Sequence, residues 1–314
     1  NYFFGGKRSS LISTLLFAVS SLASYADSVQ SVTHEIRYER SHKYGDAHSG
    51  GQIEWTLAKG SIDLSDPGQP GLIFDFDIDR DIYLNSDDDF TDHGWDTQFK
   101  LSKAYDWGKF KFIGLEYDQK RTTKNVVTED YNYTTGPIWK LYGGYLETFL
   151  AYDRNSMTDA DRWGIDVDFE KTWFKKSGDW GTVSLWNNTE LHYRFESENK
   201  TYRYADDNLD IYNETSLLYR TPNYGPFYAS VEAYGELSKN TEDDTRLSTT
   251  YKLMPLVGAQ WKVNHFSFNP YVSYEVFDRK TTFYKNDIVS DSNDRITVTD
   301  NNELAVGLII KWTK

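Results

Sequence analysis

The sequence contains no cysteine and little proline or methionine, and each shortage narrows the range of folds. A chain of 314 residues without cysteine has no disulfide scaffold, so another source of stability must hold it together. The chain has only 7 prolines, which often end helices, and only 2 methionines, which often fill the cores between packed helices. We therefore expect a fold that relies neither on disulfides nor on packed helices.

Long hydrophobic runs are also missing, apart from one near the start of the chain. Lys7 and Arg8 precede an apolar run over 11–23, and a small residue, Ala26, follows shortly after it. A basic start, about 7–15 apolar residues and a small-residue cleavage site are typical of a secretory signal peptide. We predict a cleaved signal peptide at residues 1–26, with a buried helix or a membrane anchor as the alternatives.

Basic stripes are absent as well, and acidic residues outnumber basic ones. The chain has 48 Asp and Glu against 34 Lys and Arg, a formal net charge of -14, which argues against a nucleic-acid partner. Aromatic residues are abundant at 17%, yet the mean hydropathy is -0.67. This combination is expected when aromatic rings form girdles at two membrane interfaces around a polar lumen.

Residues 161–174, DRWGIDVDFEKTWF, alternate between apolar and polar side chains. Trp163 and Ile165 share one parity with the next apolar positions, whereas Asp166 and Asp168 share the other. A period of two predicts a β-strand, because successive side chains point to opposite faces. The apolar face could meet the core of a soluble sandwich or the lipid around a membrane barrel.

The same alternation recurs along the chain in about fourteen segments, an even number as in single-chain outer-membrane barrels. Short turns such as KKSGDWG and KVNHF alternate with longer polar stretches such as RTTKNVVTEDYNYTTG and RKTTFYKNDIVSDSNDR. We expect a tight turn at Gly143 and Gly144, and a β-bulge near Gly114 where the alternation loses phase. The predicted fold is an all-β, transmembrane antiparallel β-barrel of about 14 strands over residues 27–314, and a soluble sandwich is the alternative.

In these features the chain resembles the monomeric porin G (OmpG-like) family of outer-membrane channels. The resemblance rests on the signal peptide, the strand number, short-turn hairpins at 95–118 and 167–196, and a closing strand with an apolar face. That strand departs from the family pattern, because Trp312 is followed by two further residues rather than ending the chain. The best-known member is thought to be gated by a pair of lumen histidines on neighbouring strands near the end of the chain. The matching segments here, 245–263 and 266–279, contain a histidine only in the turn between them, at His265, so the resemblance does not imply this gate.

If the apolar parity faces lipid, the other parity lines a pore, and its acids outnumber its bases. We therefore predict a water-filled channel that passes small hydrophilic solutes, ions and sugars, with a preference for cations. Neutralisation between strands is the alternative for the charges, and stacking on sugar rings is an alternative role for the tyrosines. The predicted pore-lining residues are Glu35, Arg37, Glu54, Asp75, Asp77, Asp96, Lys100, Lys140, Asp166, Asp168, Glu170, Arg194, Tyr212, Glu214, Tyr228, Glu232, Tyr234, Glu236, Lys252, Lys262, Tyr271, Glu275, Glu303 and Lys311.

Other functions find less support in the sequence. None of the 6 histidines lies in a recognisable nucleophile motif, although His34 has the lipid-facing parity where a phospholipase-like site could lie. An acid-sugar channel would need a basic lumen. A surface adhesin or receptor would bind its partner through the long loops. The acidic run NSDDDFTDHGWD could hold calcium in such a loop, but it lacks the residue spacing of a dedicated calcium-binding loop.

We therefore predict a channel in the bacterial outer membrane, without enzymatic activity and without a cofactor or metal. Its expected partners are outer-membrane lipid and lipopolysaccharide, small hydrophilic solutes and the barrel-assembly machinery. Nucleic acid is not expected as a partner. We expect a monomer, because trimeric porins usually have about sixteen or more strands.

Overall fold

The computed structural model describes residues 29–43, 51–65, 71–83, 91–122, 127–155, 160–195, 208–240, 246–284 and 295–313. The predicted signal peptide, residues 1–26, lies outside the described residues. None of the described residues forms a helix with the length and apolar character that crossing a membrane requires.

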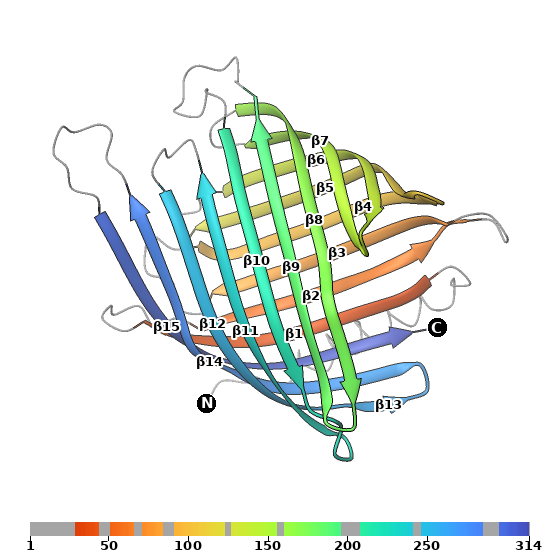
Figure 1. Ribbon diagram of the computed structural model, residues 1–314, viewed down its shortest axis with the longest axis vertical. Helices are drawn as coiled ribbons and strands as arrows, with labels where there is room; N and C mark the ends of the chain where they lie inside the picture. Colours follow the sequence, from red (N-terminus) through yellow and green to blue (C-terminus); the bar gives the residue numbers. More distant parts are fainter. Residues whose placement is uncertain are drawn as a thin grey trace, which may run out of the picture.

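Strands make up nearly all of the described chain, and Figure 1 labels them in sequence order. Their bounds are β1 (Val29–Lys43), β2 (Gly51–Asp63), β3 (Leu72–Tyr83), β4 (Thr91–Tyr105), β5 (Gly108–Thr122), β6 (Val127–Leu141), β7 (Gly144–Asn155), β8 (Ala160–Gly178), β9 (Gly181–Arg194), β10 (Asn208–Arg220), β11 (Phe227–Asn240), β12 (Arg246–Ala259), β13 (Trp261–Val263), β14 (Phe266–Tyr284) and β15 (Arg295–Thr313). Every adjacent pair is antiparallel, so the chain runs up and down around a single sheet.

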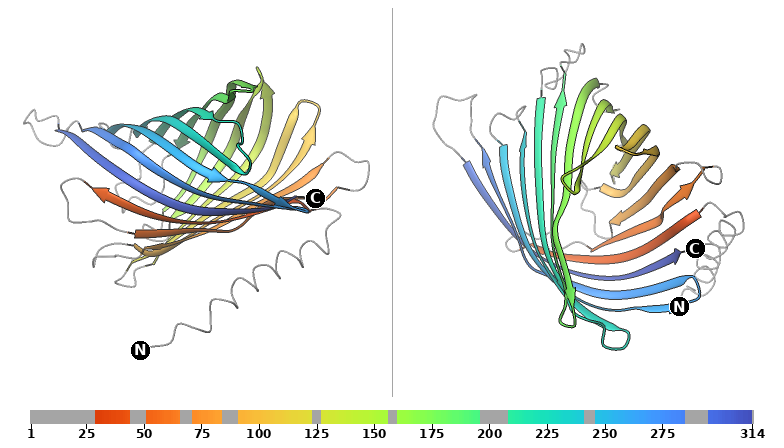
Figure 2. Two further views of the ribbon diagram at one scale, coloured as in Figure 1. Left: turned by 90° about the horizontal axis from the view of Figure 1, so that it is seen from below. Right: turned by 45° about the vertical axis from the view of Figure 1, so that its right-hand side comes forward.

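The sheet closes on itself, which confirms the predicted barrel. β1 pairs with both β2 and β15, and β12 pairs with both β11 and β14. The short β13 continues β12 beyond Gln260 along the same partner, β14, so the ring has 14 strands. Among the described strands, closure leaves only the short β13 with a single partner strand, and this nearly continuous pairing gives stability without disulfides. Figures 1 and 2 show the strongly tilted and curved strands of this ring.

Two-residue turns connect β4 to β5, β6 to β7, β8 to β9 and β13 to β14 at the end where β1 begins and β15 ends. One of them lies at Tyr142 and Gly143, one position before the predicted Gly143–Gly144 turn, so that expectation was off by one residue. Both residues have positive φ, 51° and 78°. A two-residue hairpin turn with positive φ at both positions matches the right-handed twist of its strands.

The expected long connection over 121–136 is wrong. β5 continues to Thr122 and β6 begins at Val127, so most of RTTKNVVTEDYNYTTG lies in strands. Its valine, threonine and tyrosine side chains favour extended backbone despite the polar composition. The expected bulge is confirmed, because the pairing of β5 with β6 shifts register between Lys111 and Gly114.

The two parities of the strands differ in exposure. Large apolar residues of the predicted outer parity are exposed, among them Trp163 at 55%, Ile165 at 44% and Val306 at 46%. Charged residues of the other parity are often covered, with Asp166 at 4% and Glu275 at 8%. Such a distribution is the reverse of that in a soluble sandwich, in which the apolar face is buried.

Candidate functional site

Two cavities are lined mainly by side chains of the polar parity of the strands. The larger has a volume of about 650 Å³ and the smaller about 570 Å³. Because the smaller cavity is lined by residues from β15 round to β6, it lies on the inner side of the barrel wall. Lys111, Glu116, Asn132 and Thr134 line both cavities, so the two are adjacent.

Together the cavities extend along most of the barrel. Ser31 and Lys311 line the smaller cavity near the end with the short turns, where β1 begins and β15 ends. Asp130 and Asp153 line the larger cavity near the opposite end, close to the start of β6 and the end of β7. Polar side chains therefore follow the inner wall from one end towards the other.

The two cavities differ in charge. Among the described residues that line the larger cavity, seven are carboxylates and four are Lys or Arg, besides His192. The smaller cavity has three carboxylates and four lysines. The acidic character is thus concentrated in the larger cavity, towards the end with the longer connections.

Arg194 links three neighbouring strands at the wall of the larger cavity. Its Nε bonds to Asp153 of β7, and its Nη1 bonds to Asp166 of β8. Arg194 and Asp166 are 6% and 4% exposed, so the pair is buried. Removing one partner would leave an uncompensated buried charge, and for this reason we regard the network as a rigid part of the wall.

Arg37 forms a second network where the first and last strands meet. Its guanidinium lies beside Glu39 on β1, and its Nη1 is 3.4 Å from Glu54 Oε2 on β2. Its Nη2 is 3.5 Å from Glu303 Oε1 on β15. One cation therefore faces three carboxylates, which leaves this part of the wall acidic.

Other predicted bases also pair with acids, which supports the interpretation that charges partly neutralise each other between strands. Lys100 Nζ lies 3.5 Å from Asp75, and Lys252 Nζ lies 3.4 Å from Glu275. Asp77 pairs with Lys59, which the sequence analysis did not name, at 2.5 Å.

The tyrosines predicted to line the pore donate hydrogen bonds to carboxylates or pack against glycines. The hydroxyl of Tyr212 donates to Glu214 at 2.8 Å, and that of Tyr234 donates to the same carboxylate at 2.5 Å. Tyr271 donates to Glu35 at 2.5 Å.

The rings of two of these tyrosines lie close to glycines on neighbouring strands. A Cβ on Gly307 would lie 2.4 Å from the ring of Tyr271, and a Cβ on Gly258 would lie 2.6 Å from that of Tyr228. Ring faces held against backbone are not free to stack on sugars, so the described contacts do not favour a saccharide site at these two positions.

The remaining predicted residues make no contact with Arg194 or Arg37 among the interactions described here. Glu170 accepts a hydrogen bond from Trp186 Nε1 at 2.8 Å, and Glu232 accepts one from Ser216. Asp96 lies opposite Asp79 and Asp118 in the register, in an acidic stretch of wall. Glu236 lies near the hydroxyl of Tyr234, Lys311 lines the smaller cavity, and Lys140 and Lys262 are exposed near short turns.

Several cavity residues were missed by the sequence analysis. Glu190 and His192 have the same parity as Arg194 on β9, so extending the alternation from that residue would have found them. Lys111 and Glu116 lie on either side of the bulge in β5, where the alternation gives no consistent face. Asp153 lies on β7, whose polar residues fall on both parities and therefore mark no face.

Comparison with known proteins gives a likeness in overall shape only. No family model matches the chain, and no curated protein matches it. Among solved structures, it is similar to OmpT, an outer membrane protein of Vibrio cholerae, at 9% identity and a TM-score of 0.36, over 90% of this chain and 100% of that one.

Two further solved structures are similar at the same level. Omp33 of Acinetobacter baumannii has 8% identity and a TM-score of 0.38, over 92% of this chain and 100% of that one. OccK2 of Pseudomonas aeruginosa has 9% identity and a TM-score of 0.34, over 92% and 99%. The resemblance to the porin G family stays a prediction.

Proposed function

We propose that this chain is a bacterial outer-membrane channel, a monomer that lets small hydrophilic solutes diffuse passively through its lumen. One observation carries the proposal: the apolar parity of a closed barrel is exposed, while the charged parity surrounds two adjacent polar cavities on the inner side. Lipid is the solvent that favours such an outer face, and a closed ladder satisfies its backbone groups without water.

The lumen charges support a weak preference for cations. Charged side chains that line a pore set its ion selectivity, and the larger cavity has an excess of carboxylates. The smaller cavity has one more lysine than it has acids and opposes that preference. Pairing of Arg194 and Arg37 with carboxylates reduces the free charge further. We therefore expect a reversal potential of cation sign but of modest size.

Reconstitution into planar bilayers tests this function. We expect stepwise conductance in potassium chloride and, in a salt gradient, a reversal potential that favours potassium. Liposomes with the protein in their membrane should also swell when they are placed in a solution of a small sugar. Liposomes that stay impermeable to ions and sugars would overturn the channel proposal. A reversal potential that favours chloride would overturn the cation preference alone.

A further inference from the structure

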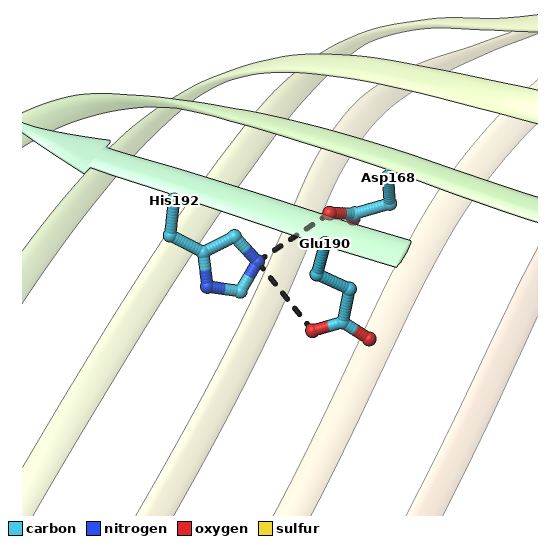
Figure 3. Close-up of side chains that lie close together, drawn as sticks. All are labelled: Asp168, Glu190 and His192. Atoms are coloured by element: carbon cyan, nitrogen blue, oxygen red, sulfur yellow. Dashed lines mark ion pairs between the residues drawn. The ribbon is translucent and has the colours of Figure 1, made fainter. Parts of the chain in front are cut away.

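Three potential metal ligands come together on two neighbouring strands at the wall of the larger cavity. In the register of β8 with β9, Asp168 lies opposite Glu190, and His192 is two residues further along β9 on the same face. All three line the larger cavity. Figure 3 shows their polar ends directed towards one another, with one ring nitrogen of His192 facing an oxygen of each carboxylate.

We propose that Asp168, Glu190 and His192 bind a divalent transition-metal ion of the zinc class. One ligand atom from each residue lies within 4.8 Å of the other two. His192 Nε2 is 3.4 Å from Asp168 Oδ1 and 3.6 Å from Glu190 Oε2. Zinc binds nitrogen and oxygen at about 2.0–2.2 Å in a tetrahedron, whose neighbouring ligand atoms are therefore about 3.4 Å apart. The two nitrogen–oxygen distances match that spacing.

The ligand types select the class of metal. Two carboxylates provide two negative charges, which balance a divalent ion when the imidazole is neutral. An imidazole nitrogen suits zinc, nickel or copper, whereas calcium and magnesium are bound by oxygen ligands. Three protein ligands leave a fourth position open to the cavity, where water or a solute could bind.

A second observation supports a ligand at this position. Oδ1 of Asp168 is shielded from solvent, and among the described residues it has no hydrogen-bond partner besides the imidazole of His192, 3.4 Å away. Glu190 is also oriented, because Asn188 Nδ2 donates to its Oε1 at 2.6 Å and leaves Oε2 towards His192. Hydrogen bonds from outer residues commonly orient metal ligands in this way.

Zinc titration of the untagged barrel in detergent, after treatment with a chelator, tests the site by calorimetry. We expect saturable binding of one zinc ion per chain, and at least tenfold weaker binding in His192→Gln and in Asp168→Asn. His265→Gln is the matched control, since His265 is an exposed histidine on the turn between β13 and β14. This control should bind zinc as the unchanged protein does.

Cobalt provides a second readout that needs no variant. Cobalt bound by one nitrogen and two oxygens in a tetrahedral site gives visible absorption bands, which zinc should abolish and calcium should not.

If His192→Gln does not fold, Glu190→Gln takes its place in the zinc titration.

Absence of saturable zinc binding, or equal affinity in His192→Gln and the unchanged protein, would overturn the site. Neither measurement needs ion flow, so failure of the metal site and failure of the channel can be told apart. A barrel that binds zinc without conducting supports the site and overturns only the channel. A barrel that conducts without binding zinc does the reverse.

Discussion

Arg37 on β1 lies 3.5 Å from Glu303 on β15, measured from Nη2 to Oε1, although 266 positions separate the two residues in the sequence. This ion pair crosses the line where the first strand of the barrel meets the last. Glu39, which is 7% exposed, contacts the same guanidinium. Closure of the barrel therefore places one cation against three carboxylates, of which Glu39 is nearly covered from water.

Replacing Arg37 with glutamine should destabilise the barrel, because it leaves the covered Glu39 beside Glu54 and Glu303 without a cation. We expect the free energy of unfolding to fall by about 1–3 kcal/mol, as when a buried polar group is left without its partner. Urea unfolding in detergent measures the effect.

Lys59→Gln is the matched control for Arg37→Gln. Lys59 also pairs with a carboxylate, Asp77, but its side chain is 65% exposed. Exposed pairs contribute about 0–1 kcal/mol, so this variant should be close to the unchanged protein. Equal losses in the two variants would contradict the role assigned to Arg37.

A side chain at Gly307 should displace the ring of Tyr271, because a Cβ there would lie 2.4 Å from it. Gly307→Ala should destabilise the barrel by about 1–3 kcal/mol, the usual effect of overpacking. At Gly235, also within a strand, the nearest atoms to an added Cβ are at 3.7 Å, so Gly235→Ala is the control. If Tyr271→Ala added to Gly307→Ala does not reduce the penalty, the proposed steric cause is wrong.

A charged side chain at position 306 should destabilise the barrel, because Val306 faces lipid in the proposed membrane protein. Its register partners, Tyr38 and Val272, are also exposed and share its face. Val306→Arg should lower the free energy of unfolding in lipid vesicles by about 2–4 kcal/mol if the site is near the bilayer midplane. Thr33→Arg places the same charge against the smaller cavity and should be much milder. A reversed order would contradict the assignment of the faces.

Ion selectivity should depend on the carboxylates shared by, or next to, the two cavities. Glu116 lines both cavities and Asp118 lines the larger, so Glu116→Gln with Asp118→Asn should move the reversal potential towards zero. Asp106→Asn changes an exposed acid in a turn and should leave it unaltered. A double variant with unchanged selectivity would show that these carboxylates do not set it.

The fold could be predicted from the sequence because alternation survives wherever one face is apolar and the other polar. Residues 161–174 show this, since one parity of β8 is exposed and apolar and the other contains Asp166 and Asp168. The prediction of a loop was wrong over 121–136, where most residues are polar although Tyr131 and Tyr133 alternate with Asp130 and Asn132. The polar composition there indicated a loop although the β-propensity favoured strands.

The contacts within the wall could not be predicted in the same way. Which residue faces which depends on register, and register depends on turn lengths and bulges such as the one between Lys111 and Gly114. Alternation places Asp168 and His192 on one face of their strands but does not show that they meet. The pairing of β8 with β9 decides this, and it became visible only in the structure.

The assignment of lipid to one parity and water to the other is tested most directly by single cysteines, because the chain has none of its own. Neighbouring positions form natural pairs on three strands: Ser216 and Leu217, Glu232 and Ala233, Glu303 and Leu304. In lipid vesicles, a water-soluble, membrane-impermeant thiol reagent should modify cysteine at the first position of each pair and spare the second until the protein is unfolded. Modification of both positions at the same rate in all three pairs would contradict the account.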